Sequence, residues 1–439
     1  MGTTSTSVCL PVSLRLLFSV QEACPWMNGG DVPGNASIAT SRVEPVRGSC
    51  AEVLFVFLRL GCTSFGGPIA HLGYFQKEIV ERRKWCSAST LAEIIALAQS
   101  LPGPASSQAG FALGILRAGW LGGLAAWIGF TLPSALLMLA FAYGHSFLGG
   151  SVGQGLIHGL QLVAVAVVAQ AVMAMQRALA PDRVRIALAI ASTGLTLLLP
   201  SQTASLIAIA AGAAAGLLLF RAENDESSEC IGLALPKAFG VVSAAAFLAL
   251  LVIVPLIAQA SSNFELTVFS AFYRSGALVF GGGHVVLPLL EGAVVAPGWV
   301  TQKSFLAGYG AAQALPGPLF SVSAYLGAEV RPSSSPLLYS LLGLFGIFMP
   351  GLLAMTALLP FWNAIRRNRY VQSSLRGINA SVVGILIAAL FQPLWTSTIH
   401  SSADFWIVLS AFALLTLWKV QPWFVVLCVV AISSLAYSI

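Results

Sequence analysis

Long apolar runs follow one another from Glu52 almost to the end of this sequence. A helix needs about 20 mostly apolar residues to cross a bilayer. Runs of this kind lie at residues 52–68, 89–115, 120–143, 153–175, 184–200, 203–220, 236–258, 265–282, 304–329, 337–360, 374–395, 405–418 and 422–438. Only 9% of the residues are charged, against about 25% in soluble domains, which excludes a water-soluble fold. The sequence therefore predicts an all-α polytopic membrane protein with about thirteen transmembrane helices in a lipid bilayer.

The distribution of Lys and Arg predicts how these helices are oriented. Positive residues collect in the cytoplasmic loops of membrane proteins, and most of the 22 Lys and Arg fall on the side of the N-terminus. We therefore expect a cytoplasmic N-terminus and a C-terminus outside. The cations of segment 77–84 fall outside instead, so either this segment is an amphipathic surface helix or the run 52–68 enters the membrane and returns. A net charge of +6 without a basic stripe argues against a nucleic-acid partner.

The sequence lacks the motifs of enzymes and metal sites. Its seven cysteines have no metal-like spacing, no lysine ends a P-loop, and neither HExxH nor GxSxG occurs. We predict no catalytic residue, no metal and no cofactor, so the energy must come from a gradient or a partner. Residues 1–48 are polar, show no clean signal peptide, and are expected to form a disordered tail.

The chain contains an internal duplication. The hexapeptide that starts at Gln99 and ends at Pro104 recurs from Gln313 to Pro318. Further matches follow in the same order at nearly the same offset, including Arg59 with Arg274. An ordered series of matches indicates a true repeat. We predict two transporter repeats, 49–220 and 263–439, joined by a linker and one extra helix at 221–262.

The second repeat is predicted to be inverted in the membrane. Each half contains six apolar runs, and the odd run 236–258 between them makes the second half enter from the opposite side. The charges agree, because loop 144–152 has no Lys or Arg whereas its counterpart 361–370 has three Arg. Inverted repeats with interrupted helices are typical of secondary transporters, which bind their substrates near the midplane between the repeats.

Each repeat carries one helix interruption and one glycine-rich turn. The interruptions consist of Pro102, Gly103 and Pro104 in the first half and Pro316, Gly317 and Pro318 in the second. The turns contain Gly66 and Gly67 in the first half and Gly281, Gly282 and Gly283 in the second. Freed backbone groups are tolerated in a bilayer only within protein or beside a wet cavity. Glycine lets backbone N–H groups approach a bound oxyanion, and helix N-termini favour negative charge, so we predict an anion site.

Two arginines occupy equivalent positions within the apolar runs. An arginine at the centre of a span costs about 2.5–3.5 kcal/mol on insertion scales, and this chain has Arg59 in one repeat and Arg274 in the other. Guanidinium groups form bidentate hydrogen bonds with oxyanions, so two of them would neutralise a dianion. The alternative is that Arg59, close to either end of its run, snorkels to the interface or caps the carbonyls of a broken helix.

The remaining polar residues near the interruptions each allow two interpretations. Gln99 and Gln313 directly precede the breaks, where they hydrogen-bond either the substrate or the interrupted backbone. His71, His284 and Glu291 are candidates for carrying a coupling proton, because histidine titrates near neutrality. Structural roles are the alternative, since the two histidines do not occupy equivalent repeat positions.

These motifs together resemble a known family. The stretch from Leu58 to Pro68, the Lys84-Trp85 pair and the Gln-x-Leu-Pro-Gly-Pro break are similar to the signature of the chromate ion transporter family, long two-domain form. The second half repeats the pattern from Phe280 to Pro318, and the resemblance covers about residues 50–420. It implies export of chromate across the plasma membrane, chromate resistance, and coupling to protons or another ion, with sulfate as a close competitor. Gly283 stands where the first half has Pro68, so the two turns need not be equally rigid.

Three other functions remain open from the sequence. A sulfate or other oxyanion importer or exchanger would keep the same fold. An intramembrane enzyme acting on a lipid phosphate would place the arginines on the head group, but the sequence lacks an acid, base or metal cluster for it. A passive anion channel is distinguished by its inability to accumulate substrate against a gradient.

Overall fold

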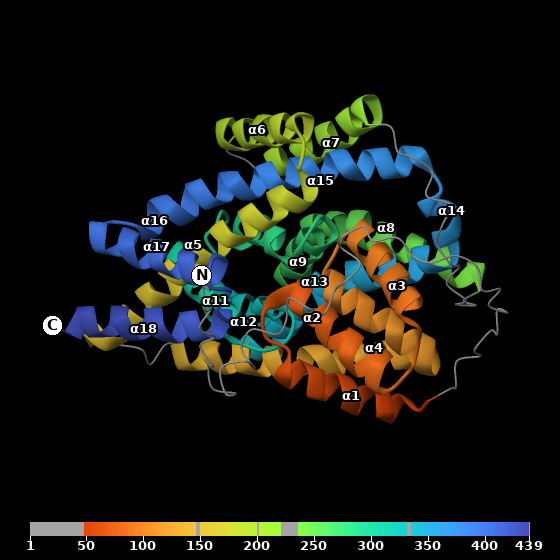
Figure 1. Ribbon diagram of the computed structural model, residues 1–439, viewed down its shortest axis with the longest axis horizontal. Helices are drawn as coiled ribbons and strands as arrows, with labels where there is room; N and C mark the ends of the chain where they lie inside the picture. Colours follow the sequence, from red (N-terminus) through yellow and green to blue (C-terminus); the bar gives the residue numbers. More distant parts are fainter. Residues whose placement is uncertain (1–47, 146–149, 200–201, 221–235, 332–334, 439) are drawn as a thin grey trace, which may run out of the picture. The chain divides into compact units, whose positions relative to one another are not determined.

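The structure is a computed structural model that describes residues 48–145, 150–199, 202–220, 236–331 and 335–438. Within these ranges the chain is helical and contains no strand, which confirms the all-α prediction. The described residues belong to one compact unit that begins at Pro45 (Figure 1). The predicted tail 1–48, apart from Gly48, and most of the predicted linker lie outside the described residues.

The first half contains a set of short helices followed by long ones. Its elements are α1 (Cys50–Thr63), α2 (Gly67–Phe75), the π-helical η3 (Gln76–Arg82), α3 (Ala88–Ser100), α4 (Ala105–His145), α5 (Gly150–Leu179), α6 (Arg183–Leu198) and α7 (Gln202–Leu219). The backbone of α4 is non-helical at Ala118 and Gly119, where two predicted runs meet.

The second half repeats this order after one additional helix, α8 (Lys237–Ser261). Its elements are α9 (Phe264–Ala277), η4 (Gly283–Val285), α10 (Val286–Val294), α11 (Gln302–Ala314), η5 (Leu319–Ser321), α12 (Val322–Val330), α13 (Pro336–Leu358), η6 (Leu359–Phe361), α14 (Trp362–Arg366), α15 (Arg369–Ala389), η7 (Leu390–Trp395), α16 (Thr396–Thr398), α17 (Ser402–Thr416) and α18 (Pro422–Ser438). Helix α8 exposes apolar residues such as Val242, Val252 and Leu256 along its length, as a lipid-facing helix does.

Matching capping residues start the equivalent helices of the two halves. Ser87 caps α3 by accepting a hydrogen bond from the Thr90 N–H, and Thr301 caps α11 through the Ser304 N–H. Ser49 and Asn263 do the same for α1 and α9. Each of these side chains satisfies an otherwise unpaired N–H of the first turn. The repeat is thus preserved at the level of individual helix starts.

Five helices in the described part of the chain are long and apolar enough to cross a membrane, namely Ala105–Gly144, Gly150–Leu179, Lys237–Ser261, Pro336–Phe361 and Arg369–Thr398. Other predicted runs are divided into shorter helices: run 89–115 becomes α3 and the start of α4, and run 304–329 becomes α11, η5 and α12. Helices α1 and α9 have 14 residues each, or about 21 Å at 1.5 Å per residue, which is less than the roughly 30 Å of a bilayer core. Both end at a glycine-rich turn, because glycine disfavours helix continuation.

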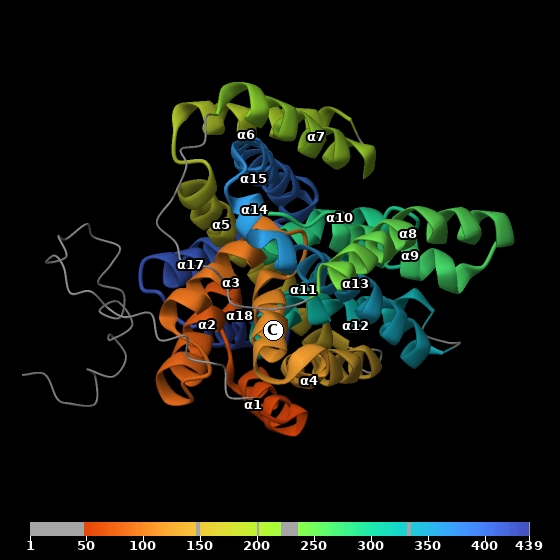
Figure 2. The same cartoon turned by 90° about the vertical axis from the view of Figure 1, so that its right-hand side faces the viewer.

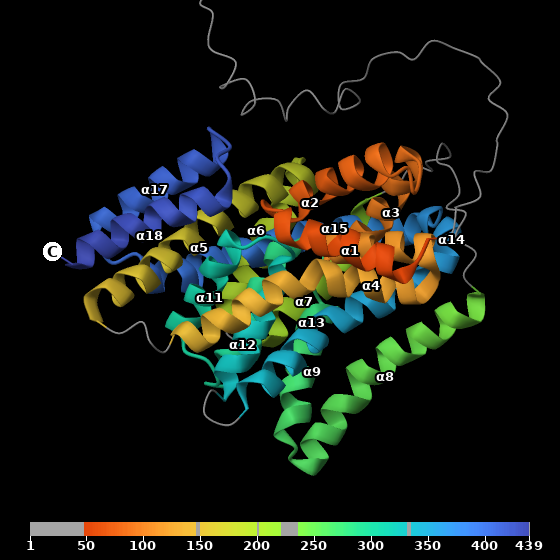
Figure 3. The same ribbon diagram turned by 90° about the horizontal axis from the view of Figure 1, so that it is seen from below.

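The last helices of each half pack against one long helix of the other half, α5 or α15. Helices α17 and α18 lie along α5, and α6 and α7 lie along α15 (Figure 2, Figure 3). Glycines allow the close approach: a Cβ at Gly159 would lie 2.8 Å from the Cα of Val430, and one at Gly377 would lie 2.7 Å from the Cα of Gly216. Each half thus packs its last two helices on a long helix of the other half, which joins the two halves.

The charged segment 77–84 forms part of an ion-pair cluster. Helix η3 buries Ile79 and exposes Lys77 and Arg82, which fits the amphipathic interpretation. Glu78 accepts hydrogen bonds from Arg82 and Arg83, at 3.0 and 2.7 Å. The cluster continues to helix α1, where the Arg117 Nη2 lies 3.1 Å from a carboxylate oxygen of Glu52.

Candidate functional site

The two Pro-Gly-Pro segments interrupt helices as predicted. The first separates α3 from α4, and the second separates α11 from η5. Gly103 and Gly317 both have positive φ, +120° and +94°, a region that side chains other than glycine disfavour. A Cβ at Gly103 would lie 2.7 Å from the Cα of Gly351, and one at Gly317 would lie 2.9 Å from the Ser134 Oγ. Two properties therefore favour glycine at each break, the positive φ angle and the close neighbours of an added Cβ.

Each break is held by a backbone hydrogen bond to the other half. The Gly103 N–H donates to the Val279 carbonyl oxygen (2.8 Å), and the Gly317 N–H donates to the Ser64 carbonyl oxygen (2.9 Å). Val279 and Ser64 directly precede the glycine-rich turns of their own halves. Reciprocal contacts between equivalent residues are the signature of a two-fold relation. The structure thus brings breaks and turns together across the boundary between the halves.

The two glycine-rich turns also contact each other. A Cβ at Gly283 would lie 3.3 Å from the Pro68 Cγ. Pro68 lies in the first turn of α2, which starts at Gly67, whereas η4 and α10 follow the turn of the second half. The difference between Pro68 and Gly283 therefore lies at the contact point of the two turns.

Buried hydroxyl and imidazole groups surround the breaks. His71 is 1% exposed, its Nδ1 lies 3.3 Å from the Ser106 Oγ, and its ring packs against Phe130. The His71 ring also hydrogen-bonds the backbone of Ser64. Three buried hydroxyl groups, those of Ser64, Ser107 and Thr131, have no hydrogen-bond partner in the residues described. Most of these atoms are hydrogen-bond donors, which suits a ligand that presents only acceptors.

A glutamine that the sequence interpretation missed supports the first break. The Gln108 Nε2 donates to the carbonyl oxygens of Pro102 and Gly351, both at 2.9 Å. Gln99 is exposed on α3 instead, and Gln313 is partly buried, with its side chain hydrogen-bonded to Tyr309. The counterpart of Gln108 in the second half is Val322. Because Gln108 has no glutamine at the matching position, a comparison of the two halves does not identify it.

The second half has a different polar arrangement. The His284 Nδ1 lies 2.8 Å from the hydroxyl oxygen of Tyr309, which is 1% exposed. Tyr309 is one turn before Gln313 on α11, so it connects His284 to the helix that ends at the break. Glu291 is partly buried on α10. The sequence interpretation missed Tyr309, whose counterpart in the first half is Ile95.

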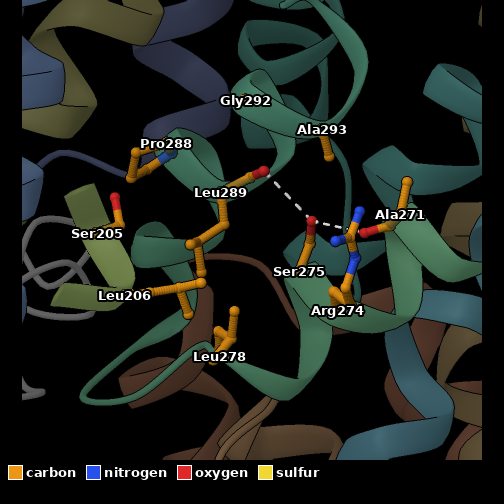
Figure 4. Close-up of a pocket in the computed structure, with 10 residues that line it drawn as sticks. All are labelled: Ser205, Leu206, Ala271, Arg274, Ser275, Leu278, Pro288, Leu289, Gly292 and Ala293. Carbon is orange, nitrogen blue, oxygen red and sulfur yellow. Dashed lines mark hydrogen bonds between the residues drawn. The ribbon is translucent and has the colours of Figure 1, made fainter. Parts of the chain in front are cut away.

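Arg59 and Arg274 are both exposed on their helices. Neither guanidinium group makes a hydrogen bond or ion pair with any residue that the structure describes. Arg274 lines a pocket of about 70 Å³ between α7, α9 and α10, together with Ser275, Pro288 and Leu289 (Figure 4). Arg59 does not line this pocket. Both positive charges are thus available to an anion at positions that correspond in the two halves.

Three relatives align with this chain over most of its length. A chromate transport protein from Pseudomonas aeruginosa is 28% identical over 361 residues, 81% of this chain and 83% of the relative. A probable chromate transport protein from Synechococcus elongatus is 27% identical over 87% of this chain and 95% of the relative. A chromate transport protein from Cupriavidus metallidurans is 25% identical over 83% of this chain and 87% of the relative. No solved structure matches this chain.

The family profile named Chromate transporter matches this chain twice. The matched residues are 51–217 and 266–434, one segment in each predicted repeat. The resemblance inferred from the motifs is therefore confirmed over both halves. This chain belongs to the chromate transporter family.

Proposed function

We propose that this protein is a secondary transporter that exports chromate from the cytoplasm across the plasma membrane and so gives chromate resistance. The relatives described as chromate transport proteins support the substrate. The observation that carries the mechanism is the reciprocal hydrogen bonding of Gly103 and Gly317 to the opposite half. Two interrupted helices that meet in this way are suited to a substrate path between repeats.

The binding site in this proposal is built from the breaks and the glycine-rich turns. A tetrahedral oxyanion has acceptors only, so its site needs donors. Three unpartnered hydroxyl groups are candidates. Ser64 contacts the second break through its carbonyl oxygen, Ser107 lies in the first turn of α4, and Thr131 follows Phe130, whose carbonyl oxygen lies 3.3 Å from a Cβ placed at Gly317. The backbone N–H groups of both turns, and the side chains of Gln99 and Gln313, are further candidate donors.

Arg59 and Arg274 supply the positive charge for the dianion. Their support is that both guanidinium groups lack a protein partner among the described residues and lie in the helix that leads to each turn. An arginine that only stabilised the fold would be expected to bond carbonyl groups or carboxylates. Sulfate, a dianion of the same shape, competes for the same site.

The repeats are inverted in this proposal, with the N-terminus in the cytoplasm and the C-terminus outside. The two-fold pattern of contacts between the halves supports a symmetric relation, and the additional helix α8 between them supports opposite orientations. The charge distribution gives the direction.

Proton coupling is assigned to one or more of His71, His284 and Glu291. All three are at least partly buried near the turns or on the helices that follow them. A proton bound at such a site would reduce the negative charge that crosses with chromate or restore the site after release. Export that lowers the cytoplasmic chromate concentration below the outside concentration requires energy. A gradient of another ion has to supply it.

Flux into proteoliposomes tests the proposal. Purified protein is reconstituted, and uptake of labelled chromate and sulfate is followed with and without an imposed pH gradient. We expect chromate accumulation above the external concentration that depends on the gradient and is reduced by sulfate. Equilibration without accumulation would identify a channel, and uptake of sulfate with no chromate transport would overturn the substrate assignment.

A further inference from the structure

A histidine of the first half and an aspartate of the second half form a hydrogen-bonded pair. His158 lies on α5, and Asp404 lies in the first turn of α17, which packs against α5. The His158 Nε2 lies 2.8 Å from the Asp404 Oδ1, and the two side chains are only 13% and 12% exposed. Neither residue belongs to the site proposed above. The two halves are thus joined through a group that can bind a proton.

The hydrogen bonds of Asp404 determine which nitrogen of the His158 ring can bind this proton. The Asp404 Oδ2 accepts from the backbone N–H groups of His400 and Ser401, at 3.1 and 3.0 Å. These bonds stabilise the ionised carboxylate, which can only accept hydrogen bonds. The His158 Nε2 therefore carries the hydrogen, and Nδ1, which bonds none of the described residues, is the nitrogen that can take up a proton.

The His158 ring lines a polar cavity of about 320 Å³, room for roughly ten water molecules. The other titratable groups of the lining are Lys303 on α11, His400 before α17 and Tyr437 on α18. All three residues are exposed, so water screens the charge of Lys303. Asp404 is the charged group that contacts the His158 ring directly. A proton on Nδ1 therefore gives an imidazolium that stays paired with a negative charge.

Gln302 connects this cavity to a proton candidate of the transport site. Its side chain lines the cavity and hydrogen-bonds the Glu291 carboxylate. Glu291 lies on α10, the helix that follows the glycine-rich turn of the second half. Because the His158 ring and the Gln302 side chain border the same cavity, water within it can carry a proton from His158 to Glu291.

We propose that His158 is the proton-loading residue of this transporter, that its Nδ1 takes a proton from the cavity water and passes it through that water to Glu291, and that Asp404 positions the ring. The inference rests on the proposed transport function and deepens it by naming Glu291 as the acceptor. His158 gains one proton and one positive charge, and it returns to the neutral form as the Glu291 carboxylate becomes a neutral carboxyl group. The charge on α10 thereby depends on proton uptake at His158.

Flux in proteoliposomes tests the loading residue. His158→Gln keeps a donor for the Asp404 carboxylate but cannot bind a proton. Under an imposed pH gradient this variant should accumulate chromate at least about fivefold less than the wild type, the lower range of coupling between two bound ligands. Exchange of internal for external chromate at equal pH needs no net proton movement and should stay near the wild-type rate. The matched control is His400→Gln, whose native ring bonds the Ser397 carbonyl oxygen, and it should accumulate chromate like the wild type.

Asp404→Asn tests the positioning role. Its amide oxygen can still accept from the two backbone N–H groups, but its amide nitrogen then donates to the His158 Nε2 and places the ring hydrogen on Nδ1. Gradient-driven accumulation should therefore fall as in His158→Gln, while chromate exchange continues. Asp404→Glu keeps the carboxylate and should retain more of the accumulation. Equal loss of accumulation and exchange in Asp404→Asn would make this aspartate purely structural and contradict its positioning role.

Nitrogen NMR of the purified full chain with isotope-labelled histidines separates this inference from the proposed function, because it requires no transport. The signals that disappear in His158→Gln identify the ring. We expect Nδ1 to gain a proton between pH 8 and pH 5 while Nε2 stays protonated. A ring that gains no proton in this range, or unchanged gradient-driven accumulation in His158→Gln, would overturn the inference. Proton uptake at Nδ1 in a wild-type protein that transports no chromate would overturn the transport function and leave the proton-binding site standing.

Discussion

The two halves of this molecule share a backbone plan and differ in their chemistry. Gly103 and Gly317 make corresponding hydrogen bonds across the boundary between the halves. The side chains beside the two breaks do not correspond, since His71 contacts Ser106 in one half and His284 contacts Tyr309 in the other. The two halves therefore share backbone contacts, whereas each break has its own polar groups.

The same contrast appears where the halves are anchored. In the first half, Arg117 pairs with Glu52 and lies over the Trp85 ring at 5.2 Å. The equivalent Arg331 lies over the Phe264 ring at 3.9 Å, while Glu265 accepts from the Tyr339 hydroxyl. Both halves thus keep a cation–π contact, but the Arg–Glu ion pair of the first half has a tyrosine–glutamate hydrogen bond in its place in the second.

The largest effect is expected from filling the breaks. Gly103→Ala places a Cβ against the backbone of Gly351, which cannot move aside, whereas Gly317→Ala meets the side chain of Ser134. We expect Gly103→Ala to lower the free energy of unfolding by about 2–4 kcal/mol and Gly317→Ala by less. Thermal unfolding in detergent measures both.

Two further variants sharpen this comparison of the breaks. Gly73→Ala is the control, because no atom lies within 4 Å of its added Cβ. Ser134→Gly should partly rescue Gly317→Ala by removing the side chain that it meets. Equal destabilisation by Gly103→Ala and Gly73→Ala would contradict the packing described for the first break.

The second effect concerns the paired arginines. Arg59→Ala and Arg274→Ala should each reduce chromate export about tenfold or more, the size of a lost charge-assisted contact, and should leave the protein folded because neither side chain has a partner among the described residues. Cellular chromate content and the amount of protein in the membrane are measured together. Export at the wild-type rate by both variants would remove these arginines from the site.

A smaller effect is expected from the tyrosine that occurs in one half only. Tyr309→Phe leaves the His284 Nδ1 without its hydrogen bond, at a cost of about 1–3 kcal/mol. Tyr273→Phe is the matched control, since its hydroxyl group bonds the Phe247 carbonyl oxygen between α8 and α9, away from the breaks. Both variants should lose stability, but only Tyr309→Phe should change how export depends on the pH gradient. An identical gradient dependence in the two variants would make His284 structural.

The smallest effect concerns the ion-pair cluster formed by Glu52, Glu78, Arg82, Arg83 and Arg117 in the first half. Partial burial acts to raise the pKa of Glu78, but hydrogen bonds and charges of Arg83 and Arg82 outweigh it and hold this pKa below its ordinary value. The stabilisation is therefore complete above the pKa of an unfolded glutamate, about 4.3, and is lost as the pH falls through the lower folded-state pKa. Glu78→Gln should cost under about 1 kcal/mol at neutral pH.

Unfolding measured from pH 3 to 7 checks this prediction for the wild type and Glu78→Gln. The difference between the two proteins should shrink as the pH falls, because protonation removes the negative charge from the wild type as well. A constant difference over this range would show that the ion pairs with Arg82 and Arg83 contribute nothing to stability.

The parts of the fold that repeat are the parts that the sequence predicted well. Proline and glycine at Pro102–Pro104 and 316–318 act locally, so the helix breaks were predictable without tertiary contacts. Short elements such as α2 and α10 were missed, because nine residues give too little periodicity to detect. The packing of α6 and α7 on α15, and of α17 and α18 on α5, joins segments that are distant in the sequence. No local pattern encodes it.

The candidate site was predictable only where the two halves match. Arg59, Arg274 and both breaks were singled out from the sequence because each has a counterpart, whereas Gln108 and Tyr309 align with Val322 and Ile95 and were not. Their roles come from partners that are distant in sequence, such as the Gly351 carbonyl oxygen for Gln108.

Cysteine accessibility tests the opposite orientation of the halves most directly. Ser87 and Thr301 are exposed, equivalent caps of α3 and α11, so Ser87→Cys and Thr301→Cys report on the same position in each repeat. Each is introduced separately into a protein whose seven native cysteines are replaced by serine, and a membrane-impermeant thiol reagent is applied to intact cells and to inverted vesicles. We predict labelling of Ser87→Cys from outside and of Thr301→Cys from the cytoplasmic side; labelling of both from one side would contradict the inverted arrangement.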